Sequence, residues 1–213
     1  MDILAYGATA LGAYLLGSIP TGYLVARARG VDIRAAGSGN IGATNVMRIL
    51  GKPAGIAVLV VDGLKGFAAC AWLCDLVAAG WHVPETQISA LRIVAGVAAV
   101  VGHNFTCWLH FRGGKGIATS AGAYFALAPL AAAIALGVWM VFLALGRYVS
   151  LASIAAAVAL PTAVWLTKGL ALGLVTSVLG LMAIWKHRGN IGRLLKGTEN
   201  RLGRPPDAQE AAK

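Results

Sequence analysis

The stretch Ile117–Gly146, "IATSAGAYFALAPLAAAIALGVWMVFLALG", decides how many times this chain crosses a membrane. It is 30 residues long, carries no charge, and has Pro129 near its middle. A single spanning helix needs only about 20 apolar residues. Proline removes a backbone donor and kinks or ends a helix. The stretch is therefore either one long helix or two short helices divided at Pro129.

The composition of the whole chain is that of an integral membrane protein. Of its 213 residues, 58% are hydrophobic and 12% are charged, whereas soluble domains carry about 25% charged residues. The formal net charge is +10. In a membrane protein such an excess sets orientation, so we expect no nucleic-acid partner. Without repeats or linkers, residues 1–213 are expected to form a single polytopic domain, with 186–213 as a basic cytoplasmic tail.

The distribution of basic residues predicts the sidedness of the loops. The apolar runs cover residues 3–26, 54–79, 91–111, 117–146, 148–167 and 170–185. Between the first two runs lie five Lys/Arg, the loop "WHVPETQ" has none, and the chain from Lys186 onward has seven. Cytoplasmic loops carry the excess of Lys and Arg. We therefore expect the N-terminus outside and the C-terminus in the cytoplasm.

An outside start and a cytoplasmic end require an odd number of crossings. Six runs give an even number, so the run 117–146 is expected to split at Pro129. Short or broken helices occur only where they are buried in protein or line a cavity. The predicted fold class is thus an all-α integral membrane protein with about seven transmembrane helices, some short or broken.

Two glycine-rich stretches resemble nucleotide-binding motifs, but the residues around them exclude both. "GSGNIG" (37–42) with Asp62 beyond it imitates a dinucleotide-binding fingerprint, but charged residues precede it and a run of helix length follows it. "GGKG" lacks the Ser or Thr that a P-loop needs after its lysine. Cys70 and Cys74 share a helix face with no nearby histidine, so we expect helix packing, no metal site and no cofactor.

The first cytoplasmic loop, "AAGSGNIGATNVMR" (35–48), has the composition of an anion site. Glycines allow backbone N–H groups to converge on an anion, and Arg48 offers a planar fork suited to phosphate. The alternative is an ordinary basic cytoplasmic loop. The candidate substrate-binding residues of this loop are Gly39, Asn40, Gly42, Thr44, Asn45 and Arg48, and Ser38 is a candidate catalytic residue.

Further polar groups lie within or beside the apolar runs. Asp62 and Lys65 are three residues apart and can pair; charges at membrane depth are either functional or a structural ion pair. "GHNF" supplies His103 and Asn104, for which a structural role is the alternative. "FRGGKG" then supplies Lys115 as a compact cation for phosphate, with glycines for close backbone approach. Its glycines are Gly113, Gly114 and Gly116.

The tail segment "HRGNIGRLLKGTEN" (187–200) forms the third polar cluster. Its candidates are His187 and Asn190 as catalytic residues, with Arg188 and Glu199 binding substrate. A basic amphipathic tail on anionic lipid is the alternative. Because all three clusters are assigned to the cytoplasmic side, we expect one pocket able to hold more than one phosphate, with membrane lipid around it.

Four motifs in order, "SGNIGATNVMR", "DGLKG", "GHNF…FRGGKGIAT" and "HRGNIGRLLKGTE", resemble those of the bacterial acyl-phosphate:glycerol-3-phosphate acyltransferase family, PlsY. Ile41, Thr106 and Cys107 depart from the family's usual residues. The resemblance implies a seven-helix enzyme of the bacterial inner membrane whose active site is cytoplasmic. It also implies that acyl phosphate and glycerol 3-phosphate are the substrates and lysophosphatidic acid the product, in the first step of phospholipid synthesis.

No nucleophile elbow, Ser–His–Asp or Cys–His arrangement is evident in the sequence. We therefore expect direct acyl transfer without a covalent acyl-enzyme, with a substrate phosphate or His187 accepting the proton. No obligate protein partner is expected. The rival hypotheses are a transporter of a phosphorylated solute, which broken helices and buried cations also suit, and a structural or lipid-binding membrane protein.

Overall fold

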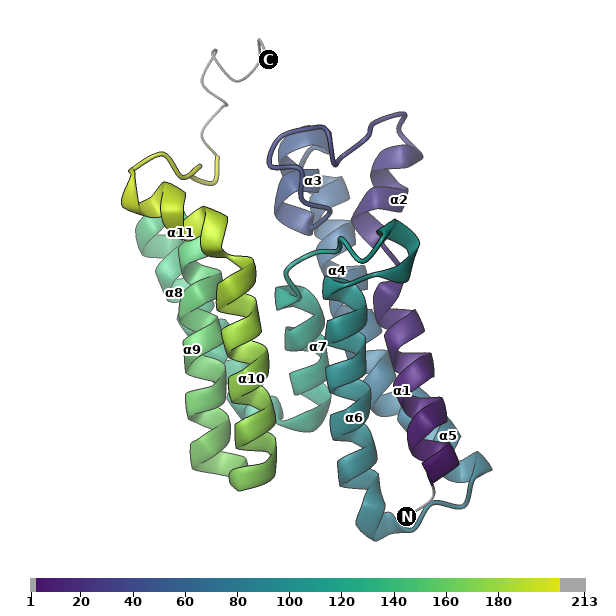
Figure 1. Cartoon of the computed structure of the whole chain (residues 1–213). Coiled ribbons are helices and arrows are strands. Elements are labelled where there is room, and N and C mark those ends of the chain that lie inside the picture. The colour runs from purple at the N-terminus through teal and green to yellow at the C-terminus, as the bar shows by residue number, and fades with distance from the viewer. Residues whose placement is uncertain (1–2, 204–213) are drawn as a thin grey trace. The chain divides into compact units, whose positions relative to one another are not determined.

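The computed structural model describes residues 3–203 and is helical throughout, with no strand in that range. It forms two compact units, residues 1–132 and 133–213, which we describe separately (Figure 1). The boundary lies within one helix, α8. The predicted all-α membrane class is confirmed. That the chain forms a single domain stays a prediction, and residues 204–213 of the predicted tail lie outside the described residues.

The first unit is a helical bundle in which the short helices α2 and α3 lie at one end and the short helix α5 at the other (Figure 1). Its helices are α1 (Ile3–Ser18), α2 (Thr21–Arg27), α3 (Ala43–Leu50), α4 (Lys52–Ala68), α5 (Cys74–Gly80), α6 (Glu85–Asn104) and α7 (Ile117–Leu127). A π-helical turn, Ala69–Leu73, joins α4 to α5, and a 3₁₀ turn, Cys107–Leu109, follows α6.

Small residues bring the helices of the first unit into close contact. A methyl group added at Gly66 would overlap the carbonyl of Thr119, and one at Gly122 would overlap the carbonyl of Gly63, so α4 and α7 touch backbone to backbone. Gly17 lies equally close to Ala99, where α1 packs on α6. Such small-residue contacts are how helices associate in lipid, where no hydrophobic force drives them together.

The second unit consists of four helices and the coil that follows them. They are α8 (Pro129–Gly146), α9 (Val149–Lys168), α10 (Leu170–Lys186) and α11 (Arg188–Leu195). α9 and α10 form an antiparallel pair joined at Gly169, whose φ of 81° is a conformation that favours glycine. α10 and α11 meet at a bend of 55°.

By length and apolarity, the described residues contain five helical segments able to span a membrane, or six if α10 and α11 count as one bent span. The shorter apolar helix α7, with 11 residues, is additional. α7 ends at Leu127 and α8 begins at Pro129, so the predicted division of the 117–146 run is confirmed. The number of crossings and the sidedness stay predictions.

Two predicted spans differ from the structure. The run 3–26 is broken between Ser18 and Thr21, because Pro20 has no N–H with which to continue the helix. The span predicted over 91–111 is instead helical from Glu85 to Asn104. It starts directly after Pro84, which is extended, and it stops where Phe105 leaves the helical conformation. Apolarity alone placed both boundaries several residues too late.

Candidate active site

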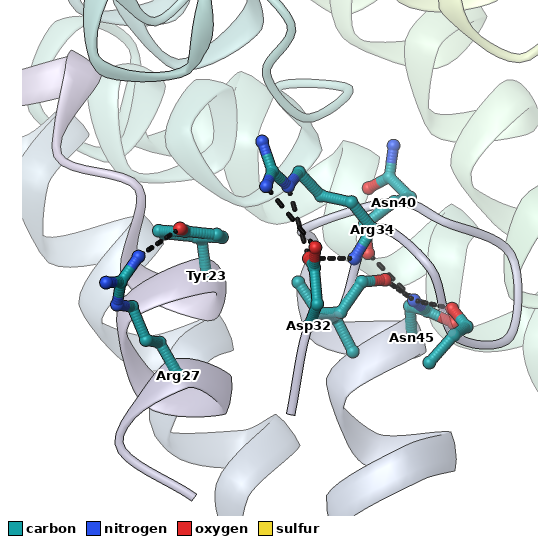
Figure 2. Close-up of polar contacts among 8 residues, drawn as sticks. Tyr23, Arg27, Asp32, Arg34, Asn40 and Asn45 are labelled. Atoms are coloured by element: carbon teal, nitrogen blue, oxygen red, sulfur yellow. Dashed lines mark hydrogen bonds and ion pairs between the residues drawn. The ribbon is translucent and has the colours of Figure 1, made fainter. Parts of the chain in front are cut away.

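The first loop of the first unit is organised by one side chain, that of Asn45 (Figure 2). Asn45 is 2% exposed. Its Oδ1 accepts the backbone N–H of Ser38 at 2.9 Å. Its Nδ2 lies within hydrogen-bond distance of the carbonyls of Ile33, Ala36 and Asn40, at 3.3, 3.0 and 2.9 Å. The amide thus ties four backbone positions of one loop to α3, and its donors and acceptor are occupied by the protein.

Backbone amides of this loop are also engaged within it. The N–H of Gly39 donates to the carbonyl of Ala36 at 3.0 Å, and that of Gly42 donates to Oδ1 of Asn40 at 2.9 Å. With the Ser38 amide held by Asn45, three of the amides expected to cradle an anion therefore donate inside the loop. Gly37 and Gly39 have φ of 58° and 68°, so glycine here permits the turn.

Three predicted site residues of the first loop and α3 keep accessible side chains. Ser38 and Thr44 are exposed, and Arg48, in the last turn of α3, is half-buried. α3 starts at Ala43 directly after Gly42, so the loop sets where this short helix begins.

Charged side chains form a layer outside the loop (Figure 2). Arg34 pairs with Asp32 at 3.2 Å and lies 4.9 Å from the ring centre of Tyr23. Arg27 donates to the hydroxyl of Tyr23 at 2.8 Å. The hydrogen bonds from Arg34 hold the pKa of Asp32 below its usual value and raise the pKa of Arg34 itself. These contacts fix the loop's entry without using any predicted site residue.

A buried ion pair lies where the first helix is broken. Lys65 Nζ is 2.8 Å from Oδ1 of Asp62, as the sequence spacing predicted, and both side chains are 4% exposed. Lys65 also donates to the carbonyl of Ile19 at 2.9 Å, and Thr21 donates to Asp62 at 3.0 Å. A broken helix in a membrane requires such partners for its freed backbone groups.

The second glycine loop rests on the end of α6. The N–H of Gly114 donates to the carbonyl of His103 at 3.0 Å, and that of Gly113 donates to the carbonyl of Asn104 at 3.2 Å. The last carbonyls of a helix have no partner within it, so the loop satisfies them. A methyl group at Gly114 would overlap the imidazole of His103, and one at Gly116 would lie 2.7 Å from Oδ1 of Asn104. The glycines thus allow the loop backbone to lie against α6. That they also allow close approach to a phosphate stays a prediction.

Thr106, one of the departures from the family's usual residues, also serves the break in the first helix. Its hydroxyl donates to the carbonyl of Ser18 at 2.5 Å. The hydroxyl of Ser18 donates to the carbonyl of Gly102 at 3.3 Å. These contacts join the start of the second loop to the first helix.

The two loops border one cleft of about 700 Å³ at the same end of the first unit. It is lined by Asp32, Arg34, Ala35, Gly39, Ile41, Leu109, His110, Arg112 and Gly113. The predicted site residues Gly39 and Gly113 both lie on it. Lys115 follows one residue beyond Gly114 and is half-buried. The structure thus brings the first glycine loop and the "FRGGKG" loop to one cleft. That the tail segment shares this pocket stays a prediction.

In the second unit, Glu199 is the centre of a polar clamp. It accepts hydrogen bonds from Ser150 Oγ at 2.8 Å, Asn190 Nδ2 at 2.6 Å and Arg193 Nε at 2.7 Å. Burial alone would raise the pKa of Glu199, but these three donors outweigh it and lower the pKa. The carboxylate thereby fixes the coil after α11 against the start of α9.

His187 lies at the junction of α10 and α11. It is 3% exposed, and its Nδ1 is 2.8 Å from the carbonyl of Ala183. Because a carbonyl only accepts, Nδ1 carries the proton in this contact. Arg188 is exposed, with its guanidinium 4.3 Å from the ring centre of Trp185. The predicted proximity of His187 and Asn190 follows from the helical turn that joins them.

The predicted residues fall into four structural settings. The first loop and α3 hold Ser38, Gly39, Asn40, Gly42, Thr44, Asn45 and Arg48. The second loop holds Gly113, Gly114, Lys115 and Gly116. The helices beneath the second loop hold Asp62, Lys65, His103 and Asn104. His187, Arg188, Asn190 and Glu199 belong to the second unit. The sequence analysis missed Thr21, Ser18 and Thr106, and Pro20 inside an apolar run is the feature that would have pointed to them.

No group of three or more His, Cys, Asp or Glu side chains able to hold a metal ion occurs within residues 3–203. Cys70 and Cys74 are buried free thiols on the π-helical turn and α5, in the packing role expected of them.

Comparison with known proteins gives one consistent result. The model of the family described as glycerol-3-phosphate acyltransferase matches residues 7–197. The chain is 53% identical to a glycerol-3-phosphate acyltransferase of Geobacter metallireducens over 192 residues, covering 90% of this chain and 94% of the relative. It is 47% identical to that of Desulforamulus reducens, covering 91% and 93%.

The fold is similar to that of PlsY (YgiH), an integral membrane glycerol 3-phosphate acyltransferase whose crystal structure has been solved in two forms. For the glycerol 3-phosphate form the TM-score is 0.83 at 39% identity, over 93% of this chain and 96% of that one. For the lysophosphatidic acid form the TM-score is 0.80.

Proposed function

Because the chain belongs to the glycerol-3-phosphate acyltransferase family, we propose that it moves a fatty acyl group from an acyl phosphate to the 1-hydroxyl of glycerol 3-phosphate. The products are lysophosphatidic acid and inorganic phosphate. The reaction takes place at the cytoplasmic face of a bacterial inner membrane. The similar structures in glycerol 3-phosphate and lysophosphatidic acid forms support this acceptor and this product.

The observation that carries the proposal is the pair of glycine loops at one end of the first unit. Gly39 and Gly113 line one cleft, so the two loops are neighbours. Next to the first loop lies Arg48, and on the second lies Lys115. Two cations, one on α3 beside the first loop and one on the second loop, suit substrates that both carry phosphate, because Arg binds phosphate bidentately and Lys acts as a point charge.

In the proposed reaction, the oxygen of the 1-hydroxyl attacks the acyl carbonyl carbon. A new ester C–O bond forms, the bond between the carbonyl carbon and the phosphate oxygen breaks, and phosphate leaves with that oxygen. The hydroxyl proton passes to a substrate phosphate. An acyl phosphate is a mixed anhydride, so the protein's contribution is positioning and charge stabilisation.

Several of the predicted residues take a role in this scheme. Lys115 contacts the acyl-phosphate group and balances its charge as phosphate leaves, while Arg48 holds the phosphate of glycerol 3-phosphate. Ser38 and Thr44, both exposed, orient donor or acceptor. His187 and Asn190 lie in the second unit, where Glu199 fixes Asn190; that they bind the acceptor stays a prediction.

The test is a reaction of purified protein with acyl phosphate and glycerol 3-phosphate. We expect lysophosphatidic acid and inorganic phosphate in equal amounts, without coenzyme A and in the presence of a strong chelator. Acyl-coenzyme A in place of acyl phosphate is the second arm. Product formed only with acyl-coenzyme A would overturn the donor assignment.

The proposed sidedness is tested by labelling. In a variant without native cysteines, Glu85→Cys and Gly197→Cys should react with a membrane-impermeant thiol reagent from opposite sides of intact cells. Reaction from the same side would contradict an odd number of crossings.

A further inference from the structure

The position of Lys115 is set by groups buried beneath its loop. Gly113 and Gly114, the two residues before it, hydrogen-bond to the last carbonyls of α6. Gly116, the residue after it, lies against the carboxamide of Asn104. Lys115 is thus held on both sides by the end of α6. Its height above the helix depends on the two side chains there, His103 and Asn104.

The imidazole of His103 is the larger of these two supports. It is 6% exposed, and any Cβ at Gly114 would fall on its Nε2. The loop backbone therefore lies directly against the ring. The ring occupies the space in which a shorter side chain would let the loop sink.

On its other edge, the ring faces the buried ion pair. Nδ1 of His103 is 3.7 Å from Oδ1 of Asp62, which is itself fixed by Lys65 at 2.8 Å and by the Thr21 hydroxyl at 3.0 Å. Lys65 in turn holds the carbonyl of Ile19. The ring is confined between the backbone of the glycine loop and a carboxylate of α4, which is fixed by Thr21 of α2 and by Lys65, itself bound to the break between α1 and α2.

We propose that His103, oriented by Asp62, is a positioning residue for Lys115: it supports the glycine loop from below and sets where the ammonium group meets the acyl-phosphate group. Asp62, Lys65, His103 and Asn104 then act through the loop, without touching substrate. This inference rests on the proposed role of Lys115. Misplacing a group by about 1 Å in an active site can lower the rate about 10²-fold, so the expected effect is large.

The test compares His103→Ala with Leu91→Ala. Leu91 is fully buried in the same helix, and it packs with the cluster around Cys74 and Val77, away from the loop. Both substitutions leave a cavity beside α6, so Leu91→Ala is the control for a loss of stability alone. We expect His103→Ala to lower kcat/KM by about 10²-fold, and Leu91→Ala to change it less than about threefold at a comparable thermal midpoint. Equal losses in the two variants would overturn the proposal.

A double-mutant cycle connects the effect to Lys115. If His103 acts through Lys115, adding His103→Ala to Lys115→Ala should lower the residual rate by less than about threefold, because interacting sites are not additive. A further loss of about 10²-fold would mean that His103 acts by another route and would overturn the proposal.

Steric compensation gives a second line of evidence. Gly114→Ala places a methyl group on the His103 ring and should inactivate the enzyme, whereas Gly114→Ala with His103→Ala should recover at least about tenfold over the single variant. No recovery would count against the ring as the support. Should His103→Ala yield no folded protein, His103→Ser, which is also short but keeps a polar group, replaces it in each experiment.

Hydrogen exchange separates this inference from the reaction itself. The amides of Gly113 and Gly114 donate to α6 carbonyls, and they should exchange about tenfold faster in His103→Ala than in Leu91→Ala, whatever the substrates are. Unchanged exchange would overturn the support role. If exchange is fast in His103→Ala but the wild-type protein is inactive with acyl phosphate, the acyl donor is wrong and the support role of His103 stands.

Discussion

The two glycine loops of the first unit reach similar rigidity by different means. The first loop is held by a side chain, because the single amide of Asn45 reaches four backbone groups between Ile33 and Asn40. The second loop is held by backbone, because its own amides bind the carbonyls that α6 leaves unpaired. We therefore expect the first loop to be destabilised when the side chain of Asn45 is shortened. We expect the second loop to be destabilised when a methyl group is added to one of its glycines.

The largest expected effect concerns the task of the second loop. Lys115→Ala leaves the glycines and their hydrogen bonds in place and removes only the cation. We expect kcat/KM to fall about 10²–10³-fold, the usual result of removing one group that stabilises developing charge, with the thermal midpoint unchanged. Steady-state kinetics and a thermal melt measure both. Near-normal turnover would show that the loop does not hold a phosphate.

The next effect concerns deletion in the first loop. Asn45→Ala removes four hydrogen bonds and leaves buried carbonyls unpaired, which should lower the free energy of unfolding by about 3 kcal/mol. Asn40→Ala is the control, because its side chain makes one such bond, to the N–H of Gly42. Thermal melts in detergent compare them. If both variants melt alike, the loop does not depend on Asn45.

Addition of an atom should be the harmful change in the second loop. A methyl group at Gly113 would overlap the carbonyl of His103, so Gly113→Ala should cost about 2 kcal/mol of stability, as overpacking generally does. Gly137→Ala in α8 has nothing within 4 Å of the new methyl group. Its melting temperature should be unchanged or slightly raised. A tolerated Gly113→Ala would mean that the loop can lift from α6 without cost.

The smallest effect extends the comparison to the Glu199 clamp. Since its donors lower the pKa of Glu199 below the ordinary value of 4.5, the clamp stabilises the folded state above pH 4.5 and loses this contribution as the pH falls through the lowered pKa. Glu199→Gln should therefore lose about 1 kcal/mol at pH 7 and show a shallower loss of stability below pH 4.5 than the wild type. Melts from pH 7 to pH 3 test this. Parallel pH curves would contradict it.

Much of the fold could be predicted because the bilayer constrains the sequence so strongly. Apolar length gave the helices, and Pro129 gave the division between α7 and α8. The break at Pro20 was missed because it lies inside a run that reads as one span. The start of α6 at Glu85 was missed because the first turns of the helix are polar.

The candidate site was predictable in its members and less so in their roles. Motif order identified the residues of both loops. Two roles could not be predicted, because they arise from contacts that no sequence pattern shows. The amide of Asn45 is used within its own loop, and His103 lies between Asp62 and the second glycine loop. Spacing along one helix predicted the Asp62–Lys65 pair, since residues three apart share a face. No spacing rule relates Thr21 to Asp62, which lie on different helices.

The break at Pro20 has a consequence for how this protein is made. The carbonyls of Ser18 and Ile19 are satisfied by the side chains of Thr106 and Lys65. A ribosome delivers the first helix tens of residues before either partner exists, and in lipid an unsatisfied carbonyl costs several kcal/mol. The nascent first helix therefore cannot settle alone at its final depth. We expect it to reach that depth only once Lys65 and Thr106 have been synthesised, so that the bundle closes in the order of synthesis.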